Sequence, residues 1–334
     1  MASGKDIAKL ANVSIATVSH VINDTRFVSP KTRKKVLAAM EKSSYKPNSL
    51  ARALVTGKSK TIGLIISDIG NPYYAEIFKG VENYSANKGY NVFLANSDHD
   101  INKSLEAIIA LLKKKVDGLL ILSEIDSRII QELLNSKVCF VAVNWTDEIV
   151  NTDTIYLDYK VGMKEAVDYI IKIGHKRIGF ISGPKNNLLA KPRINIFNDL
   201  MKEYEDYNIK YKIFEGDHRI LGGLRVSKEI LEDDSLKPTV LICSNDWTAI
   251  GVMNGLQNAG LKIPKDISVI GLDNILFTRF TNPPLSTIAF DKYEIGEKAT
   301  QLLLSRIDDK NKPIEQLAFK TKFIIRKSIA KPCS

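Results

Sequence analysis

Cysteine and histidine are scarce in this sequence. The three cysteines (Cys139, Cys243 and Cys333) lie far apart and form no CxxC pair, so neither a disulfide framework nor a zinc site is predicted. The four histidines lack metal-ligand spacing, and no GxGxxG, GxSxG or HExxH motif occurs. A hydrolase, a kinase or a metalloenzyme therefore has no support, and we expect no catalytic residues, no metal and no cofactor.

Long apolar runs are also missing. No stretch approaches eighteen consecutive apolar residues, which excludes a membrane-spanning helix. The first residues, MASGKDIAKLANVS, carry a lysine and an aspartate where a secretory signal needs an unbroken apolar stretch. We therefore expect a cytoplasmic protein.

Positive charge is concentrated near the N-terminus. Residues 1–60 contain 12 Lys or Arg against 3 Asp or Glu, whereas the other 274 residues contain 36 against 35. A basic head on a nearly neutral body indicates a polyanion-binding module joined to a domain with a different task. A solvated basic tail would give the same composition, but the apolar pattern of the head argues against a tail.

Three short helices are predicted in the head, over residues 5–11, 15–22 and 31–43. Ser3 and Ser14 are expected N-caps, and Pro30 opens the third helix. We expect Leu10 on the apolar stripe of the first helix and Leu37 on the inward face of the third. Two helices joined by a three-residue turn and braced by a third form a helix-turn-helix, which we assign to residues 1–46.

A short helix follows in residues 47–57, and from residue 61 the pattern changes. Apolar runs at 62–66, 92–95, 116–122, 138–143, 177–181, 211–214, 240–243 and 268–271 alternate with amphipathic helices, for example 74–87, 104–115 and 222–231. Such alternation predicts parallel sheets covered on both faces. We expect an α/β body of two doubly wound lobes, with a ligand beyond the carboxyl ends of the strands, where Asp273 follows a strand.

The second predicted helix has side chains suited to the DNA major groove. Ile15 and Ala16 are suited to thymine methyl groups, and His20 can donate to a purine acceptor. Ser14, Thr17 and Ser19 complete the polar set, with Thr17 and Ser19 assigned to phosphates. Lys5, Arg33, Lys34 and Lys35 would add attraction that weakens with salt.

Leu54 lies in a small basic segment, residues 48–56. It is suited to a wedge between base pairs in the minor groove, or to a contact with the body, and the spacing does not separate the two.

Several segments resemble the LacI/GalR family of bacterial transcriptional regulators. The head carries DIAKLANVSIATVSHVIN, VSPKTRKKVLAAMEKSSYKPN and LARAL, and TVSHVIN followed by TRFV is similar to the purine-responsive members. The similarity continues through NPYYAEIFKGVE, KKKVDGLLIL, GHKRIGFISG, SNDWTAIGV and ISVIGLDN. It covers essentially the whole chain.

The resemblance implies a homodimer on a palindromic operator in double-stranded DNA. Ile15, Ala16 and His20 would read bases, and Leu54 would be the minor-groove wedge. The body would be of periplasmic-binding-protein type, with a first lobe of residues 58–158 plus 288–318 and a second of 159–287 plus 319–334. A small effector would bind between the lobes.

The resemblance also implies a set of effector-binding residues: Tyr73, Tyr74, Trp145, Asp158, Arg193, His218, Asn245 and Asp273. In the purine-responsive members an arginine and a threonine occupy positions that are Asn187 and Leu189 here, and a phenylalanine corresponds to His218. Trp247 stands where a smaller residue is expected and could narrow the cleft. We therefore expect a sugar or sugar derivative, with a purine corepressor as the alternative.

The predicted function is a repressor whose operator affinity is set by lobe closure around an effector. Three other classes were weighed. A soluble sugar-binding protein would lack the basic head, and an α/β enzyme with a DNA-binding head would need a nucleophile and base that the sequence does not offer. An architectural DNA-binding protein would have no effector.

Overall fold

The computed structural model describes residues 3–45, 57–145, 152–185 and 187–333. The chain divides into two compact units, the head (Met1–Thr61) and the body (Ile62–Ser334). In these described ranges no helix combines the length and the apolar character that a bilayer crossing requires. Leu54 and the predicted 47–57 helix lie almost wholly outside the described residues.

The head contains the three predicted helices, α1 (Gly4–Ala11), α2 (Ile15–Asn23) and α3 (Pro30–Lys42). Ser3 and Asp6 form a capping box at α1, and Ser14 caps α2 by accepting from the Thr17 amide. Asn12 adopts a left-handed conformation (φ 53°) at the end of α1, in the short turn that leads to α2. The three predicted helices begin within one residue of their expected positions, and both predicted caps are confirmed.

A small apolar core holds these helices together. It is formed by Ile7, Ala8 and Ala11 of α1, Val18 and Val21 of α2, and Val36 and Ala39 of α3. Two expectations were wrong, because Leu10 and Leu37 are 56% and 51% exposed. Ala8 and Ala11 of α1 and Ala39 of α3 belong to the core, whereas the two leucines lie outside it.

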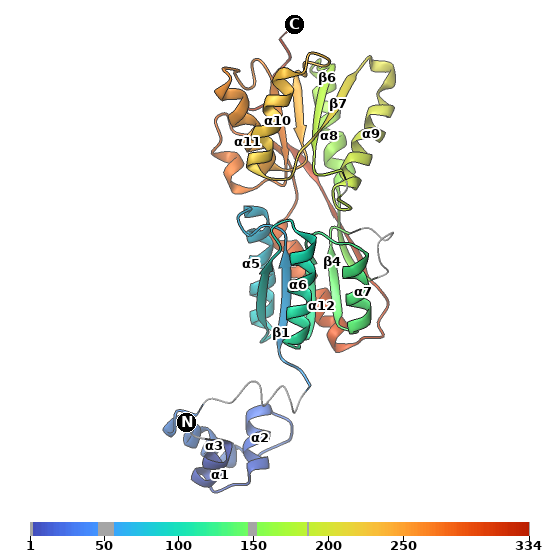
Figure 1. Cartoon of the computed structure of the whole chain (residues 1–334). Helices are drawn as coiled ribbons and strands as arrows, with labels where there is room; N and C mark the ends of the chain where they lie inside the picture. Colours follow the sequence, from blue (N-terminus) through green and yellow to red (C-terminus); the bar gives the residue numbers. More distant parts are fainter. Residues whose placement is uncertain (1–2, 46–56, 146–151, 186, 334) are drawn as a thin grey trace. The chain divides into compact units, whose positions relative to one another are not determined.

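The body consists of two lobes, each built on a six-stranded sheet (Figure 1). The first sheet has the order β11-β5-β4-β3-β1-β2, and the second has the order β12-β10-β9-β8-β6-β7. Parallel pairing dominates, and the short β12 pairs antiparallel with β10. The strands are β1 (Thr61–Ile66), β2 (Asn91–Asn96), β3 (Gly118–Leu122), β4 (Cys139–Val143), β5 (Asp153–Asp158), β6 (Arg177–Ser182), β7 (Lys210–Glu215), β8 (Val240–Cys243), β9 (Ser268–Leu272), β10 (Ser286–Ala289), β11 (Gln316–Lys320) and β12 (Lys322–Ile324).

Helices cover the sheets as the α/β pattern predicts. In the first lobe they are α5 (Pro72–Asn87), α6 (Ile101–Lys113), α7 (Ser127–Ser136) and α12 (Lys292–Asp308). The second lobe has α8 (Tyr159–Lys172), α9 (Lys191–Glu203), α10 (Ile220–Glu232) and α11 (Asp246–Asn258), with the short η1 (Glu205–Tyr207) and η2 (Leu276–Arg279). The doubly wound fold predicted for the body is thereby confirmed.

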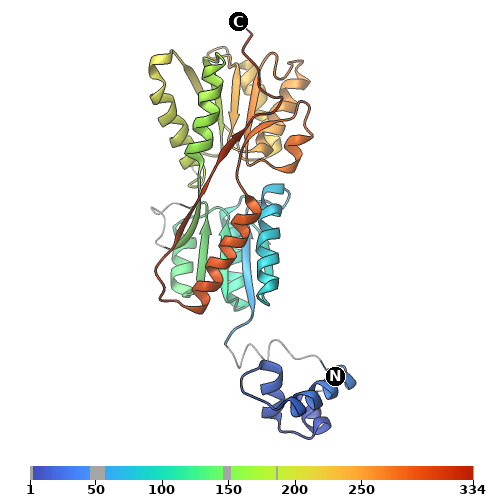
Figure 2. The same cartoon turned by 180° about the vertical axis from the view of Figure 1, so that it is seen from behind.

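The chain passes between the lobes three times. It leaves the first sheet after β5, returns after β10 through α12, and crosses again between β11 and β12 (Figure 2). β10 ends at Ala289 and β11 ends at Lys320. The second and third crossings therefore lie a few residues from the boundaries expected at 287/288 and 318/319. Each lobe therefore depends on segments that are distant in sequence.

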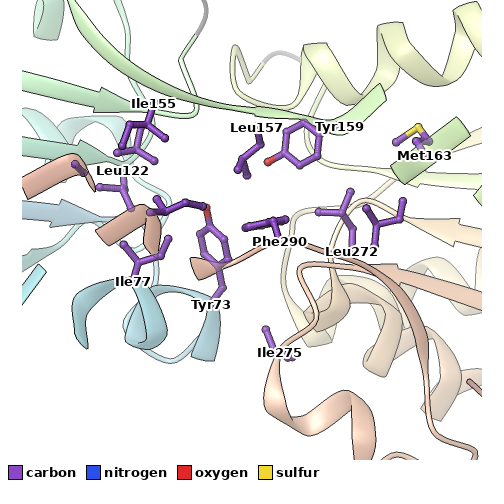
Figure 3. Packing of buried hydrophobic residues seen from close by; sticks show 14 of the residues in the cluster. Tyr73, Ile77, Leu122, Ile155, Leu157, Tyr159, Met163, Leu272, Ile275 and Phe290 are labelled. Carbon is purple, nitrogen blue, oxygen red and sulfur yellow. The ribbon is translucent and has the colours of Figure 1, made fainter. Parts of the chain in front are cut away.

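Buried apolar side chains continue from one lobe into the other (Figure 3). Tyr73 and Leu122 come from the first lobe, Tyr159 and Leu272 from the second, and Phe290 lies between them. Tyr159 and Phe290 meet edge to face with ring centroids 6.5 Å apart. The polar side chains of the cavity between the lobes lie beside this shared core.

Candidate functional site

The first turn of α2 presents short side chains to solvent. Ile15 is 51% exposed and Ala16 is also exposed, whereas Val18 and Val21 are buried in the head core. The expected exposure of Ile15 is confirmed. Since the helix uses its valines for packing, its N-terminal face is free to approach another surface.

The polar side chains of α2 are oriented by neighbours. His20 Nδ1 lies 2.8 Å from the Thr25 hydroxyl oxygen, which fixes the ring and leaves Nε2 as its other polar atom. The Thr17 hydroxyl lies 2.9 Å from that of Ser14, and Ser19 accepts a 3.2 Å hydrogen bond from Asn23. These contacts hold the predicted DNA-reading side chains in place without using all of their donors.

The basic residues of the head differ in their exposure and in their contacts. Lys5, Lys34 and Lys35 are exposed. Arg33, also expected to attract DNA, forms an ion pair with Asp24. Arg33 is therefore less available to an external anion than these three lysines.

A cavity opens between the two lobes of the body. The first lobe contributes Ser67, Asn71, Tyr73, Tyr74, His99, Leu122, Glu124, Val143 and Asn144, and the second contributes Asn187, Leu189, Arg193, His218, Asn245 and Asp273. Most of these side chains can form hydrogen bonds. Polar groups that line a pocket can fix the orientation of a bound small molecule.

Tyr73 and Tyr74 are placed in the cavity by the start of α5. The Asn71 side chain caps this helix by accepting a 3.0 Å hydrogen bond from the Tyr73 amide. The two rings meet edge to face, with centroids 4.8 Å apart. Burial raises the pKa of both tyrosines, so both keep their hydroxyl protons and can donate to a ligand.

Arg193 enters the cavity from α9. Its Nη2 donates a 2.6 Å hydrogen bond to the Tyr159 hydroxyl, and its guanidinium lies 4.5 Å from the centre of that ring. Its Nε is buried and has no hydrogen-bond partner among the described residues. A buried charged donor without a partner is costly, so this atom is suited to a ligand acceptor.

Asp273 follows β9 and has a backbone φ of 113°. Lys292 Nζ donates a 2.6 Å hydrogen bond to its carbonyl oxygen. Burial raises the pKa of the carboxyl to about 7, although Arg193 and Lys292 act to lower it. The side chain can therefore accept or donate near neutral pH, depending on its protonation.

His218 and Asn245 form the remaining wall of the second lobe. The Asn245 carbonyl oxygen caps α11 by accepting from the Thr248 amide, while its Nδ2 donates to the His218 carbonyl oxygen at 3.0 Å. Burial first, and then the charges of Arg193 and His99, lower the pKa of His218 well below its usual value. His218 is therefore a neutral imidazole.

Two predicted effector-binding residues lie away from the cavity. Asp158 caps α8 by accepting from the Lys160 amide at 3.2 Å, and its carbonyl oxygen accepts from Thr321. Trp145 is 1% exposed in an apolar cluster of the first lobe, where Leu189 packs against it. Trp247, expected to narrow the cleft, instead lies beside Phe277 with ring centroids 6.2 Å apart.

Several lining residues were missed by the sequence analysis. Ser67, Glu124 and Asn144 follow the ends of β1, β3 and β4, and His99 follows β2. The signal that could have found them is the carboxyl-end rule, which was applied to Asp273 alone. Asn187 and Leu189, considered only as departures from a family pattern, also line the cavity.

The lobes also meet beside the cavity. Arg219 Nη2 of the second lobe donates to the Asp98 carbonyl oxygen of the first at 2.7 Å and lies 3.2 Å from its carboxylate. Both side chains are roughly half exposed, so the pair contributes little to stability. It marks the edge where the lobes close on each other.

Comparison with protein families gives two matches. Residues 5–48 match "Bacterial regulatory proteins, lacI family", and residues 167–329 match "Periplasmic binding protein-like domain". The first match covers the helix-turn-helix, and the second lies mainly in the second lobe. The two matches correspond to the two units of the fold.

Two proteins are similar in sequence to this chain over nearly its whole length. A protein of Aliivibrio salmonicida named HTH-type transcriptional repressor PurR is 36% identical over 333 residues, covering 99% of this chain and 100% of that protein. A protein of the same name from Histophilus somni is 39% identical, covering 98% of this chain and 99% of its own.

Two solved structures are also similar. The lac repressor dimer bound to operator and an anti-inducer has a TM-score of 0.87 at 25% identity, covering 98% of this chain and 99% of that one. A LacI family regulator of Enterococcus faecalis with bound ribose has a TM-score of 0.71 at 30% identity, covering 81% and 99%.

Proposed function

This chain belongs to the lacI family of bacterial regulatory proteins and is a DNA-binding transcriptional repressor, and from that premise we propose how it reads DNA and what controls it. In this proposal a homodimer binds a palindromic operator in double-stranded DNA. A small molecule in the cavity between the lobes sets the operator affinity. The relatives are repressors, and we infer that the ligand is bound rather than converted.

We assign the reading of bases to the exposed face of α2. Ile15 and Ala16 are open to solvent and would contact thymine methyl groups, and His20, oriented by Thr25, would donate from Nε2 to a purine acceptor. Thr17 and Ser19 would reach phosphates, and Ser14 would complete the polar set beside them. Leu54 remains the proposed minor-groove wedge.

The observation that carries the effector proposal is that both lobes line the cavity with polar groups. Glu124 and His99 come from the first lobe, and Arg193 and Asp273 come from the second. A ligand held by both sets prefers one arrangement of the lobes, and it therefore shifts the population toward that arrangement. Differential affinity of this kind is what couples an effector site to a second site.

We propose a sugar or sugar derivative as the effector. Both lobes supply hydrogen-bonding side chains to the cavity, including Asn71, Asn144, Asn187 and Asn245, which suits a ligand with several hydroxyl groups. The ribose-bound relative with 30% identity supports the same class. Tyr73 and Tyr74 would supply the apolar surface.

A purine is the second candidate, and the relatives favour it. Proteins named as purine repressors are 36% to 39% identical to this chain over nearly its full length. The paired amide and carboxyl groups of Asn245 and Asp273 could bind the edge of a base. The imidazole rings of His218 and His99 would then provide flat surfaces on which the base stacks.

Calorimetry on the full-length protein tests the proposal, with D-ribose, D-glucose, hypoxanthine and guanine as probes. We expect a sugar to bind and to change the operator affinity of the wild type. Asp273→Asn should weaken that binding at least tenfold while operator binding without ligand is kept. Binding of the purines alone would replace the sugar by the second candidate, and no effect of any bound probe on operator affinity would overturn control through this cavity.

A further inference from the structure

Tyr159 lies where the chain first passes from one lobe to the other. β5 ends at Asp158, and Tyr159 is the first residue of α8. Its side chain is almost completely buried, and Figure 3 shows the ring among apolar side chains, with Leu157 and Phe290 nearby. A buried tyrosine needs a hydrogen-bond partner for its hydroxyl group, so the question is which residue uses this one.

The hydroxyl of Tyr159 is used by Arg193 of α9. Arg193 Nη2 donates a 2.6 Å hydrogen bond to the Tyr159 oxygen, and the guanidinium carbon lies 4.5 Å from the centre of the same ring. Among the described residues, Tyr159 is the one that accepts a hydrogen bond from the Arg193 side chain. A single tyrosine therefore holds the guanidinium in two ways, through its oxygen and through the face of its ring.

Both groups have a defined charge. Burial raises the pKa of Tyr159, although the nearby Arg193 acts to lower it, so the phenol keeps its proton at neutral pH. Arginine stays protonated in proteins. The contact is therefore a hydrogen bond from a charged donor to a neutral oxygen, which is stronger than one between two neutral groups.

The ring of Tyr159 is itself fixed by the second crossing. Phe290 lies between the end of β10 and the start of α12. It meets Tyr159 edge to face with centroids 6.5 Å apart, and it meets Tyr73 in the same way at 6.1 Å (Figure 3). These three rings, which we call the aromatic bridge, connect the support of Arg193 in the second lobe with Tyr73 of the first.

We propose that Tyr159 is a positioning residue for the effector, because it holds Arg193 so that the buried Nε of the guanidinium faces a ligand acceptor. Nε has no hydrogen-bond partner among the described residues. The inference rests on the proposed function, because Tyr159 acts through an effector-binding residue. A sugar hydroxyl oxygen and a purine carbonyl oxygen both supply the acceptor. A donor that is held in place before the ligand arrives loses less side-chain entropy on binding.

The alternative is that Tyr159 only fills space between the lobes. A phenylalanine would fill the same space and would offer the same ring face to the guanidinium. The hydroxyl oxygen is the group that only a positioning role requires. Tyr159→Phe therefore separates the two roles, because it leaves the packing and removes the acceptor of Arg193 Nη2.

Crystal structures of the full-length, ligand-free proteins test the positioning directly. In the wild type we expect Arg193 to be bonded to Tyr159. In Tyr159→Phe we expect the guanidinium to move or to take several conformations, because a buried charged donor without a partner is costly. Tyr169→Phe is the matched control, since Tyr169 also belongs to α8 and its ring packs against Phe323 at 5.9 Å. Arg193 should stay in place in that control.

Two structural results would overturn the proposal without any ligand. One is an Arg193 side chain that keeps its wild-type position in Tyr159→Phe. The other is a wild-type Arg193 that points away from Tyr159. The second result needs no variant, so it would count even if Tyr159→Phe failed to fold.

Calorimetry measures the effect on recognition, with D-ribose, D-glucose, hypoxanthine and guanine as probes. Whichever probe binds the wild type should bind Tyr159→Phe about tenfold more weakly, since a hydrogen bond to a charged group is lost. Tyr169→Phe should bind it like the wild type. Arg193→Gln removes the guanidinium, so adding Tyr159→Phe to that variant should weaken binding no further. Operator binding without ligand reports that each variant is folded.

Wild-type affinity in Tyr159→Phe would contradict the positioning role. An equal loss of affinity from Tyr159→Phe with and without Arg193→Gln would also contradict it, because Tyr159 would then act independently of Arg193. Failure of every probe to bind would remove the effector classes proposed above. The structures of the free proteins would still decide whether Tyr159 holds Arg193.

Discussion

Asp273 shows how one buried residue links the cavity to pH. Its carboxyl has a pKa of about 7 because of burial, against 3.8 for an exposed aspartate. Between these values the folded protein holds a proton that the unfolded chain releases, so this residue makes the fold less stable as pH rises from about 4 through 7.

Asp273→Asn should remove this dependence. At pH 8 the variant should be more stable than the wild type, by at most about 4 kcal/mol, since one pKa unit is worth about 1.4 kcal/mol. At pH 4 the difference should nearly vanish. Urea unfolding at both pH values measures the difference in free energy of unfolding, and the exposed Asp199→Asn serves as the control. An equal stability change at both pH values would contradict the raised pKa.

His20 tests the DNA-reading assignment at the same scale. His20→Ala should reduce the preference for operator over random DNA, because a lost base contact is worth about 1–3 kcal/mol of discrimination. Lys34→Ala removes an exposed charge of the same unit and should weaken binding to both DNAs alike. Competition binding at fixed salt measures both variants. Equal loss on both DNAs for His20→Ala would remove it from base reading.

Single residues also show what the sequence could and could not predict. Asp273 was found because it directly follows a strongly apolar strand, and the same reasoning reaches Glu124 and Asn144. Asp158 also ends a strand, yet its side chain turns to cap α8. A carboxylate at a strand end can face a cavity or cap the next helix. Which of the two occurs depends on the direction of the chain after the strand, and neither composition nor periodicity predicts that direction.

At the scale of elements, pairs of helices touch through glycines. A Cβ atom on Gly80 of α5 would lie 2.1 Å from the Tyr293 carbonyl oxygen, and one on Gly296 of α12 would lie 2.1 Å from that of Ile77. The second lobe repeats this arrangement, with Gly223 of α10 and Gly251 of α11 against each other's helix. In each lobe the two backbones are therefore in direct contact.

Gly80→Ala should force α5 and α12 apart. Overpacking of this kind costs about 1–3 kcal/mol, which corresponds to a fall of roughly 2–12 °C in Tm for a domain of this size. Lys298→Ala changes an exposed position of α12 and serves as the matched control. Thermal unfolding followed by circular dichroism provides the comparison. A Gly80→Ala protein as stable as the control would show that the helices do not depend on this contact.

Most of the predicted strands are buried and apolar, although the predicted β2 and β7 are largely exposed or half-buried, and the buried β10 and the strand β5 were not predicted. β3 and β9 are buried at every position, and apart from Ser268 their residues are apolar or glycine. β11 alternates exposed and half-buried residues at an edge, and β12 has three residues. Such short strands form because a neighbouring strand offers free backbone groups, so their sequences carry little signal.

At the scale of the whole molecule, charge separates the two tasks. Residues 1–60 carry a net charge of +9, and the rest of the chain carries +1. Operator binding should therefore fall by about 10³-fold or more between 50 and 200 mM salt, if each dimer contacts six or more phosphates. Effector binding should change far less, because the charges in the cavity are buried.

Lys34→Ala should lower the slope of log affinity against log salt by about two, since a dimer loses two lysines. Fluorescence anisotropy with labelled operator measures the slope, and calorimetry measures the effector. A salt-independent operator affinity would contradict the role given to the basic head.

The threading of the chain has a consequence for synthesis on the ribosome. The first sheet lacks its edge strand until residues 316–320 have been made, and α12, which packs on α5, begins only at Lys292. Neither lobe can therefore be finished before almost all of this sequence has emerged. Until then, the βα units that are made first expose apolar surface. We therefore expect nascent chains stalled near residue 290 to need a chaperone most.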